Sequence, residues 1–263
     1  MAKRFFAFGC SYTQYSYMTW ADIIGVNYDE YHNYGAAGSS NTFIMNRVVE
    51  VNDICKFNSE TDYVIVMLTG IGRFSFLRDA GQWQHYGELH TYYSITKDPK
   101  IKPFLDNMWT EDFAAYQSWI AVKTIKDLLV THNIPHKILM GIDNSPYTYR
   151  AGDLTQLSID RVKEIYEIVD VKQSIDEWKT LSPENKDSPY WKDIKNIDGH
   201  PSPKAYLKYL KENLPEFVTD KSINEVMEHY KIFDYSSQGN QQNNFNNTFR
   251  KVYNSNSTLI FGH

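Results

Sequence analysis

The chain has little of what marks several protein classes. It holds only two cysteines, Cys10 and Cys55, among 263 residues, too few for the disulfide framework of a small secreted domain. No apolar run approaches the roughly 20 residues of a membrane-spanning helix. The apolar stretch near the start, residues 5–8, is shorter than the ~7–15 residues of a signal peptide. We therefore expect a cytoplasmic or virion-associated protein with no signal peptide, no transmembrane segment and no membrane partner.

An excess of positive charge is also missing. Lys and Arg total 27 against 32 Asp and Glu, so the formal net charge is −5. Nucleic-acid-binding domains carry a basic patch or stripe, and we expect no nucleic acid partner here. His85 and His90 are not spaced i, i+4 and have no third ligand nearby in the sequence, so we expect no metal site and no cofactor.

What the chain does contain is an alternation of strand and helix patterns. Three apolar runs are typical of buried strands, namely residues 4–9, 62–68 and 137–142. A fourth strand is expected just before Asn33. Helical spacing of apolar residues is found at residues 17–25, 41–56 and 110–132. The apolar stripe predicted for the last helix is Phe113, Ile120, Ile125, Leu128 and Leu129. This alternation predicts a three-layer α/β fold, in which helices flank a parallel sheet.

Two long insertions interrupt the alternation, at about 77–109 and 143–197. Both contain aromatic residues, which argues against disorder, and long loops in compact domains are usually functional or disordered. These aromatics either stack on sugar faces or pack as a small auxiliary core. We expect a single domain over residues 1–232, followed by an Asn/Gln-rich tail at 233–263. The tail is either disordered or an arm for self-association or a virion contact.

Two short motifs carry candidate chemistry. Ser11 follows the first expected strand, and Gly9 lets the backbone turn there. Open α/β sheets place their sites at the carboxyl ends of the strands, although a serine in this position can also be a helix N-cap. Asp198 and His200 stand one residue apart, in a stretch that can equally be a surface turn. Together the three residues supply a nucleophile, an orienting carboxylate and a base.

The first motif resembles the SGNH (GDSL-like) hydrolase superfamily, specifically its compact bacteriophage-type members. Residues 9–13, Gly-Cys-Ser-Tyr-Thr, are similar to the family's first block, with Ser11 in the nucleophile position. Residues 35–41 look like the second block, in which Gly38 would offer its backbone N–H to the oxyanion. The resemblance implies a flavodoxin-like SGNH hydrolase fold.

The second motif is similar to the family's last block. By this resemblance Asp198 would be the triad acid and His200 the base. The family usually has two residues between them, whereas here there is only Gly199. The resemblance covers about residues 3–76 and 110–212.

The third block departs from the family. Family members carry Gly-x-Asn-Asp there, and the asparagine side chain donates to the oxyanion. This chain has Gly70-Ile71-Gly72-Arg73. Arg73 either supplies the missing oxyanion stabilisation or pairs with a structural carboxylate.

The resemblance implies a serine esterase that hydrolyses acyl esters, in the first instance acetyl esters of a carbohydrate. Its catalytic residues would be Ser11, Asp198 and His200, and its oxyanion groups Ser11, Gly38 and Arg73. The Gly-x-Ser-x-Gly elbow of α/β-hydrolases is absent, since Thr13 replaces the second glycine. The alternative is a binding or structural module on the same fold, such as a virion component, that has lost catalysis.

Overall fold

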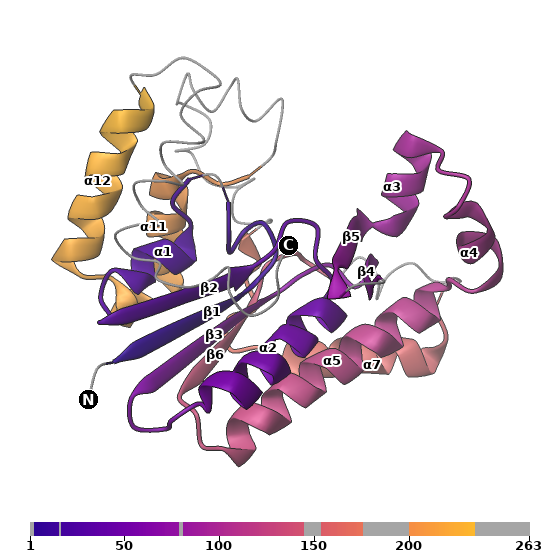
Figure 1. Cartoon of the computed structure of the whole chain (residues 1–263), viewed down its shortest axis with the longest axis horizontal. Helices are drawn as coiled ribbons and strands as arrows, with labels where there is room; N and C mark the ends of the chain where they lie inside the picture. The colour runs from indigo at the N-terminus through magenta and orange to yellow at the C-terminus, as the bar shows by residue number, and fades with distance from the viewer. Residues whose placement is uncertain (1–2, 16, 79–80, 145–153, 176–199, 235–263) are drawn as a thin grey trace.

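The computed structural model describes residues 3–15, 17–78, 81–144, 154–175 and 200–234 (Figure 1). Asp198 and nearly all of the Asn/Gln-rich tail lie outside these residues, so the predictions made for them stay predictions. In the described part of the chain, no helix is both long enough and apolar enough to cross a bilayer.

A four-stranded parallel sheet forms the centre of the molecule, in the order β2-β1-β3-β6. Its strands are β1 (Arg4–Gly9), β2 (Glu30–Gly35), β3 (Asp62–Leu68) and β6 (His136–Met140). The strands β1, β3 and β6 are predicted by their apolar runs, as is typical of strands covered on both faces. The strand expected just before Asn33 is also present, but it continues through Asn33 to Gly35. The expected parallel sheet flanked by helices is therefore confirmed.

Helices cover both faces of this sheet (Figure 1). On one face lie α1 (Trp20–Gly25), α11 (Pro203–Asn213), the 3₁₀ turn η2 (Pro215–Phe217) and α12 (Asp220–Asp234). On the other face lie α2 (Asn41–Cys55), α5 (Glu111–Thr131) and α7 (Gln156–Ile168).

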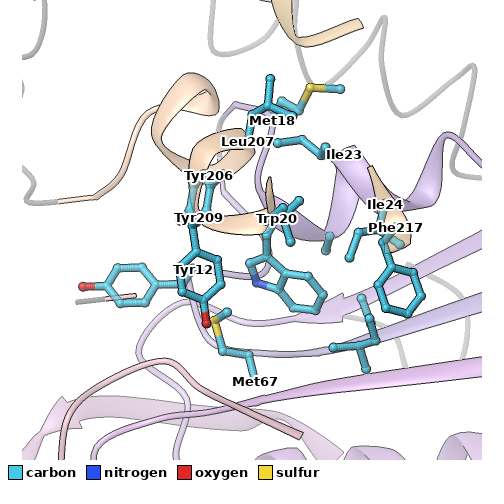
Figure 2. Close-up of a cluster of buried hydrophobic side chains, with 14 of the residues drawn as sticks. Tyr12, Met18, Trp20, Ile23, Ile24, Met67, Tyr206, Leu207, Tyr209 and Phe217 are labelled. Atoms are coloured by element: carbon cyan, nitrogen blue, oxygen red, sulfur yellow. The ribbon is translucent and has the colours of Figure 1, made fainter. Parts of the chain in front are cut away.

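Side chains of β1 alternate between the two faces and so take part in two separate cores. Phe5 and Ala7 belong to the core beneath α1 and α11, whereas Phe6 and Phe8 belong to the core beneath α2 and α5. Trp20 is fully buried at the centre of the first core, where Tyr12 and Met67 lie beside it (Figure 2). The loop that carries Ser11 is thus anchored in the core by the residue that follows it, Tyr12.

Two predicted helices differ in detail from the structure. The helix expected from residue 17 begins at Trp20, because the side chain of Asp22 accepts a hydrogen bond from the backbone of Thr19 at 2.8 Å and stabilises the helix start there. The stripe predicted for α5 is partly wrong, since Phe113 and Ile120 are 39% and 37% exposed. The buried face of α5 consists mainly of small residues together with Val122, Ile125 and Leu129. Small side chains allow close approach of α2 and α7, which are the neighbours of α5.

The first insertion forms a β-hairpin and two short helices rather than a long loop. The hairpin consists of β4 (Arg73–Leu77) and β5 (Trp83–Glu88), and the helices are α3 (Leu89–Thr96) and α4 (Lys102–Asn107). The unit projects beyond the end of α5 (Figure 1). Its aromatics pack around buried Leu89, Ile101 and Trp109 as a third, small core.

One ion pair joins the beginnings of the two central strands. Arg4 donates from Nε and Nη2 to the two oxygens of Asp62, at 2.7 and 2.6 Å. The Asp62 side chain is fully buried and also accepts hydrogen bonds from the backbone of Asn58 and the hydroxyl of Thr61. The hydrogen bonds that Arg4 donates to Asp62 raise the pKa of Arg4 further above its ordinary value, so the guanidinium stays charged.

Candidate active site

Four loops emerge at the same edge of the sheet, because all four strands run parallel. The loop after β1 and the loop after β2 are joined directly. The backbone N–H of Ala36 and the hydroxyl of Ser39 both donate to the carbonyl of Gly9, at 3.0 and 3.2 Å. The segments expected to hold the nucleophile and the oxyanion donor are therefore neighbours.

The turn that carries Ser11 is tightly packed. A Cβ on Gly9 would lie 2.0 Å from the hydroxyl of Thr13 and 3.1 Å from the carbonyl of Met67, so only glycine fits. The backbone N–H groups of Thr13 and Gln14 donate to the carbonyl of Cys10, at 2.9 and 3.2 Å. Ser11 lies in this turn and is only 6% exposed. It is not the N-cap of α1, a position that Thr19 occupies.

A buried polar network supports the turn from below. The carbonyl of Thr13 accepts hydrogen bonds from the Thr19 hydroxyl and the Asn33 amide, at 2.7 and 2.8 Å. Asp22 in turn accepts from the backbone N–H of Thr19 and from the hydroxyl of Tyr31, at 2.8 and 3.0 Å. Burial raises the pKa of Asp22 despite these hydrogen bonds, which lower it. Because the network fixes the carbonyl at position 13, it limits the movement of Ser11 two residues earlier.

His200 lies beside Ser11 although 189 residues separate them. The distance between His200 Nε2 and Ser11 Oγ is 2.8 Å. The imidazole stacks on Tyr15 with ring centroids 4.2 Å apart, and the ring of Tyr12 meets it edge-on at 5.1 Å. Both rings thus contact the imidazole while Nε2 faces the serine.

The start of α11 explains why His200 is placed there. Ser202 caps the helix by accepting a hydrogen bond from the backbone of Ala205 at 2.9 Å, and Pro203 occupies the first turn. His200 precedes this cap by two residues, so the rigid helix start determines where the imidazole enters. Asp198 lies outside the described residues, and the partner of the second ring nitrogen is not assigned.

Gly38 stands in the loop next to the Ser11 turn with a left-handed backbone, φ +73°, a conformation that glycine adopts without strain. Its carbonyl accepts a hydrogen bond from the backbone of Gly87 at 3.1 Å. Among the described residues, neither the N–H of Gly38 nor that of Ser11 donates a hydrogen bond. Both donors are therefore available to a ligand.

The loop at 69–73 is held by two asparagines that the sequence analysis did not select. Asn41 bonds to both the N–H and the carbonyl of Thr69, at 2.9 and 3.1 Å. Asn144 accepts from the N–H of Ile71 at 2.9 Å and donates to the Thr69 carbonyl at 3.4 Å. Their partners are main-chain atoms far away in the sequence, which no local pattern reveals.

Arg73 is the first residue of β4, and its Nη1 atom is buried. Within the described part of the chain, this nitrogen has no hydrogen-bond partner and Arg73 forms no ion pair. The structural carboxylate considered as its partner is therefore not seen among these residues. A buried, uncompensated guanidinium nitrogen favours binding of an anionic or carbonyl group.

His85 lies in the hairpin next to this site, and burial lowers its pKa to about 4. Because its pKa in the unfolded chain is near ~6.5, the unfolded state gains a proton first as the pH falls. We expect the free energy of unfolding to decrease from about pH 6.5 towards pH 4 and then to level off.

Denaturant titrations at several pH values measure this decrease. The free energy of unfolding should fall less in His85→Gln than in the wild type. Part of the decrease should remain in His85→Gln, because burial also lowers the pKa of His32. The exposed control His132→Gln should behave like the wild type; an unchanged decrease in His85→Gln would contradict the prediction.

The arrangement offers a hydroxyl, an imidazole that can accept its proton, and two backbone N–H groups in adjacent loops that donate to none of the residues that the structure describes. Among the described residues, no cluster of three or more His, Cys, Asp or Glu could hold a metal ion. The sequence matches no protein-family model and no curated protein.

Proposed function

We propose that the protein is a serine esterase of the SGNH type that hydrolyses acyl esters, in the first instance acetyl esters. The observation that carries this proposal is the 2.8 Å contact between His200 Nε2 and Ser11 Oγ at the carboxyl edge of the parallel sheet. This distance lies within hydrogen-bond reach for proton transfer between a nucleophile and its base.

In the proposed reaction His200 Nε2 takes the proton of the Ser11 hydroxyl as the oxygen attacks the ester carbonyl. The bond from Ser11 Oγ to the carbonyl carbon forms, and the carbonyl oxygen becomes anionic. The N–H groups of Ser11 and Gly38 donate to this oxyanion. His200 then gives its proton to the leaving alcohol as the ester bond breaks. Water attacks the acyl-enzyme in a second round of the same steps, releasing the acid.

Asp198 is proposed as the residue that orients His200 and stabilises its charged form. Asp198 precedes His200 by two residues in the sequence, and an acid and a base on one short segment can orient each other. The proposal that Asp198 is the triad acid rests on the sequence motif.

The proposed substrate is an acylated carbohydrate. Support comes from Phe76 of the hairpin, which stacks on Phe74 and Tyr86 of the third core with ring centroids 6.1 and 5.8 Å apart. Phe76 is 37% exposed, and an exposed aromatic side chain suits the apolar face of a sugar ring. We propose no cofactor, since the proton transfers need only side chains and water.

The second candidate function is a binding or structural module on the same fold. One observation favours it: Asn41 and Asn144, the asparagines next to the third-block loop, are occupied by the main chain at Thr69 and Ile71. Because the side-chain amides of Asn41 and Asn144 donate to the carbonyl of Thr69, neither replaces the family's asparagine as an oxyanion donor.

A fluorophosphonate probe separates the two functions, because it reacts with a serine that a neighbouring base activates. We expect the wild type and the control Ser94→Ala, which alters an exposed serine of α3, to be labelled at Ser11. Ser11→Ala should not be labelled. Labelling that persists in Ser11→Ala would assign the nucleophile elsewhere, and no labelling of folded wild type would favour the binding module.

Arg73 is proposed to stabilise the oxyanion in place of the missing asparagine. Arg73→Ala should then lower kcat for p-nitrophenyl acetate by about 10²-fold, the usual loss on removing one donor, with little change in KM. Arg73→Lys should recover part of the loss, because it keeps the charge. A higher KM with unchanged kcat would assign Arg73 to substrate binding, and no change in either constant would remove it from the site.

A further inference from the structure

The β4–β5 hairpin presents a serine and a histidine to the main body of the protein. Ser75 and His85 lie opposite each other in the two strands, and Ser75 Oγ is 3.0 Å from His85 Nδ1. Ser75 is only 6% exposed. The rings of His85 and Trp83 both meet the ring of Phe43 edge-on, with centroids 4.5 and 5.2 Å away. This face of the hairpin is therefore seated on the first turn of α2.

Two hydrogen bonds connect the hairpin to the loop at residues 36–40. The N–H of Ser40 donates to Ser75 Oγ at 3.0 Å. The N–H of Gly87 donates to the carbonyl of Gly38 at 3.1 Å. The two contacts fix the peptide groups that follow Gly38, and so limit rotation about Gly38, whose N–H donates to none of the described residues.

The hairpin is also tied to the third-block loop from which it grows. The N–H of Leu89 donates to the carbonyl of Gly72 at 3.2 Å, and that of Arg73 donates to Gly70 at 3.2 Å. The unit is thus closed at its base. The hairpin is also attached to the loop at 36–40. In that loop, the N–H of Ala36 and the hydroxyl of Ser39 donate to the carbonyl of Gly9.

The hydrogen-bond roles of Ser75 follow from its two partners. Its oxygen accepts from the N–H of Ser40. Its proton can be donated to His85 Nδ1 when the imidazole is neutral and carries its proton on Nε2. Burial lowers the pKa of His85 to about 4, which keeps the ring neutral at ordinary pH.

We propose that Ser75 is a positioning residue, which with His85 and Gly87 holds the 36–40 loop so that the Gly38 N–H keeps its aim at the oxyanion. The proposal rests on the proposed esterase function. Ser75 does not touch the reacting atoms in this scheme: it acts through Ser40 and Gly38. A donor displaced by a fraction of an ångström loses much of its effect on the transition state while ground-state binding changes little.

The test compares Ser75→Ala with Ser75→Thr, which keeps the hydroxyl, and with Ser94→Ala as the exposed control. Turnover of p-nitrophenyl acetate is measured per active site, counted with the fluorophosphonate probe. Backbone hydrogen exchange of residues 36–43 is followed by mass spectrometry. Because Ser75→Ala can impair folding, His85→Phe serves as a second variant, which removes the acceptor and fills the space.

We expect Ser75→Ala to lower kcat by about tenfold to 10²-fold, with KM within about twofold of wild type and faster exchange in 36–43. Ser75→Thr should recover most of the loss, and His85→Phe should change kcat and exchange in the same direction by less. Wild-type kcat per active site in Ser75→Ala, or unchanged exchange in the loop, would overturn the proposal. An inactive wild type would refute the esterase function instead, while the exchange data would still decide whether Ser75 holds the loop.

Discussion

Replacing Ser11 with alanine should lower kcat for p-nitrophenyl acetate by at least about 10⁴-fold, and adding His200→Ala should cost little more. The reason is the 2.8 Å contact between the two side chains. An imidazole without the hydroxyl has no proton to accept, and a hydroxyl without the imidazole is a weak nucleophile. Each single variant therefore already removes the shared step.

Steady-state kinetics on both single variants and the double variant measure this non-additivity. Asp198→Ala should reduce kcat by about 10⁴-fold if Asp198 orients His200. A double variant much slower than either single one would show that Ser11 and His200 act separately. Wild-type turnover in Asp198→Ala alone would assign another carboxylate to His200 and leave the pair intact.

Replacing Asp62 with alanine should lower the free energy of unfolding by about 3 kcal/mol, the lower end of the range for breaking a buried ion pair. Asp62 is fully buried, whereas Arg4 is 24% exposed, so water partly compensates the unpaired guanidinium. The variant also leaves the N–H of Asn58 without its acceptor. In a chain of this size, the loss corresponds to a fall in Tm of roughly 6–12 °C.

Denaturant unfolding of Asp62→Ala should be compared with Asp53→Ala. Asp53 pairs with Lys56 at 2.8 Å, but both side chains are exposed, and exposed pairs contribute little to stability. Asp53→Ala should therefore unfold at nearly the wild-type denaturant concentration. Equal midpoints for the two variants would show that the Arg4–Asp62 pair does not join β1 to β3 as strongly as its burial implies.

The central sheet could be predicted because its strands are apolar on both faces. Runs such as residues 62–68 can be recognised from composition alone. The stripe of α5 was less predictable, because we selected large residues at helical spacing, whereas the helix buries alanines where its neighbours approach closely. Burial of a small side chain depends on the partner helix, and the sequence of α5 alone does not identify that partner.

The β4–β5 hairpin carried a signal that the sequence analysis did not use. Phe74, Ser75 and Phe76 alternate in polarity, as a strand with two different faces does. Gly81 takes the left-handed backbone, φ +75°, in the segment between the two strands. The hairpin's contacts with Gly38 and Ser40 could not be predicted, because each joins segments far apart in the sequence: the N–H of Gly87 to the carbonyl of Gly38, and the N–H of Ser40 to the Ser75 hydroxyl.

The pairing of Ser11 with His200 has a consequence for when the proposed site can form during synthesis and folding. Loop closure over 189 residues carries an entropic cost that neighbouring segments do not meet, and such distant contacts slow folding. The helix that places the imidazole, α11, joins the core around Trp20 through Tyr206, Tyr209 and Leu210. On the ribosome Ser11 is synthesised 189 residues before His200. The contact between the two side chains therefore cannot form until α11 has been made and has docked on the sheet.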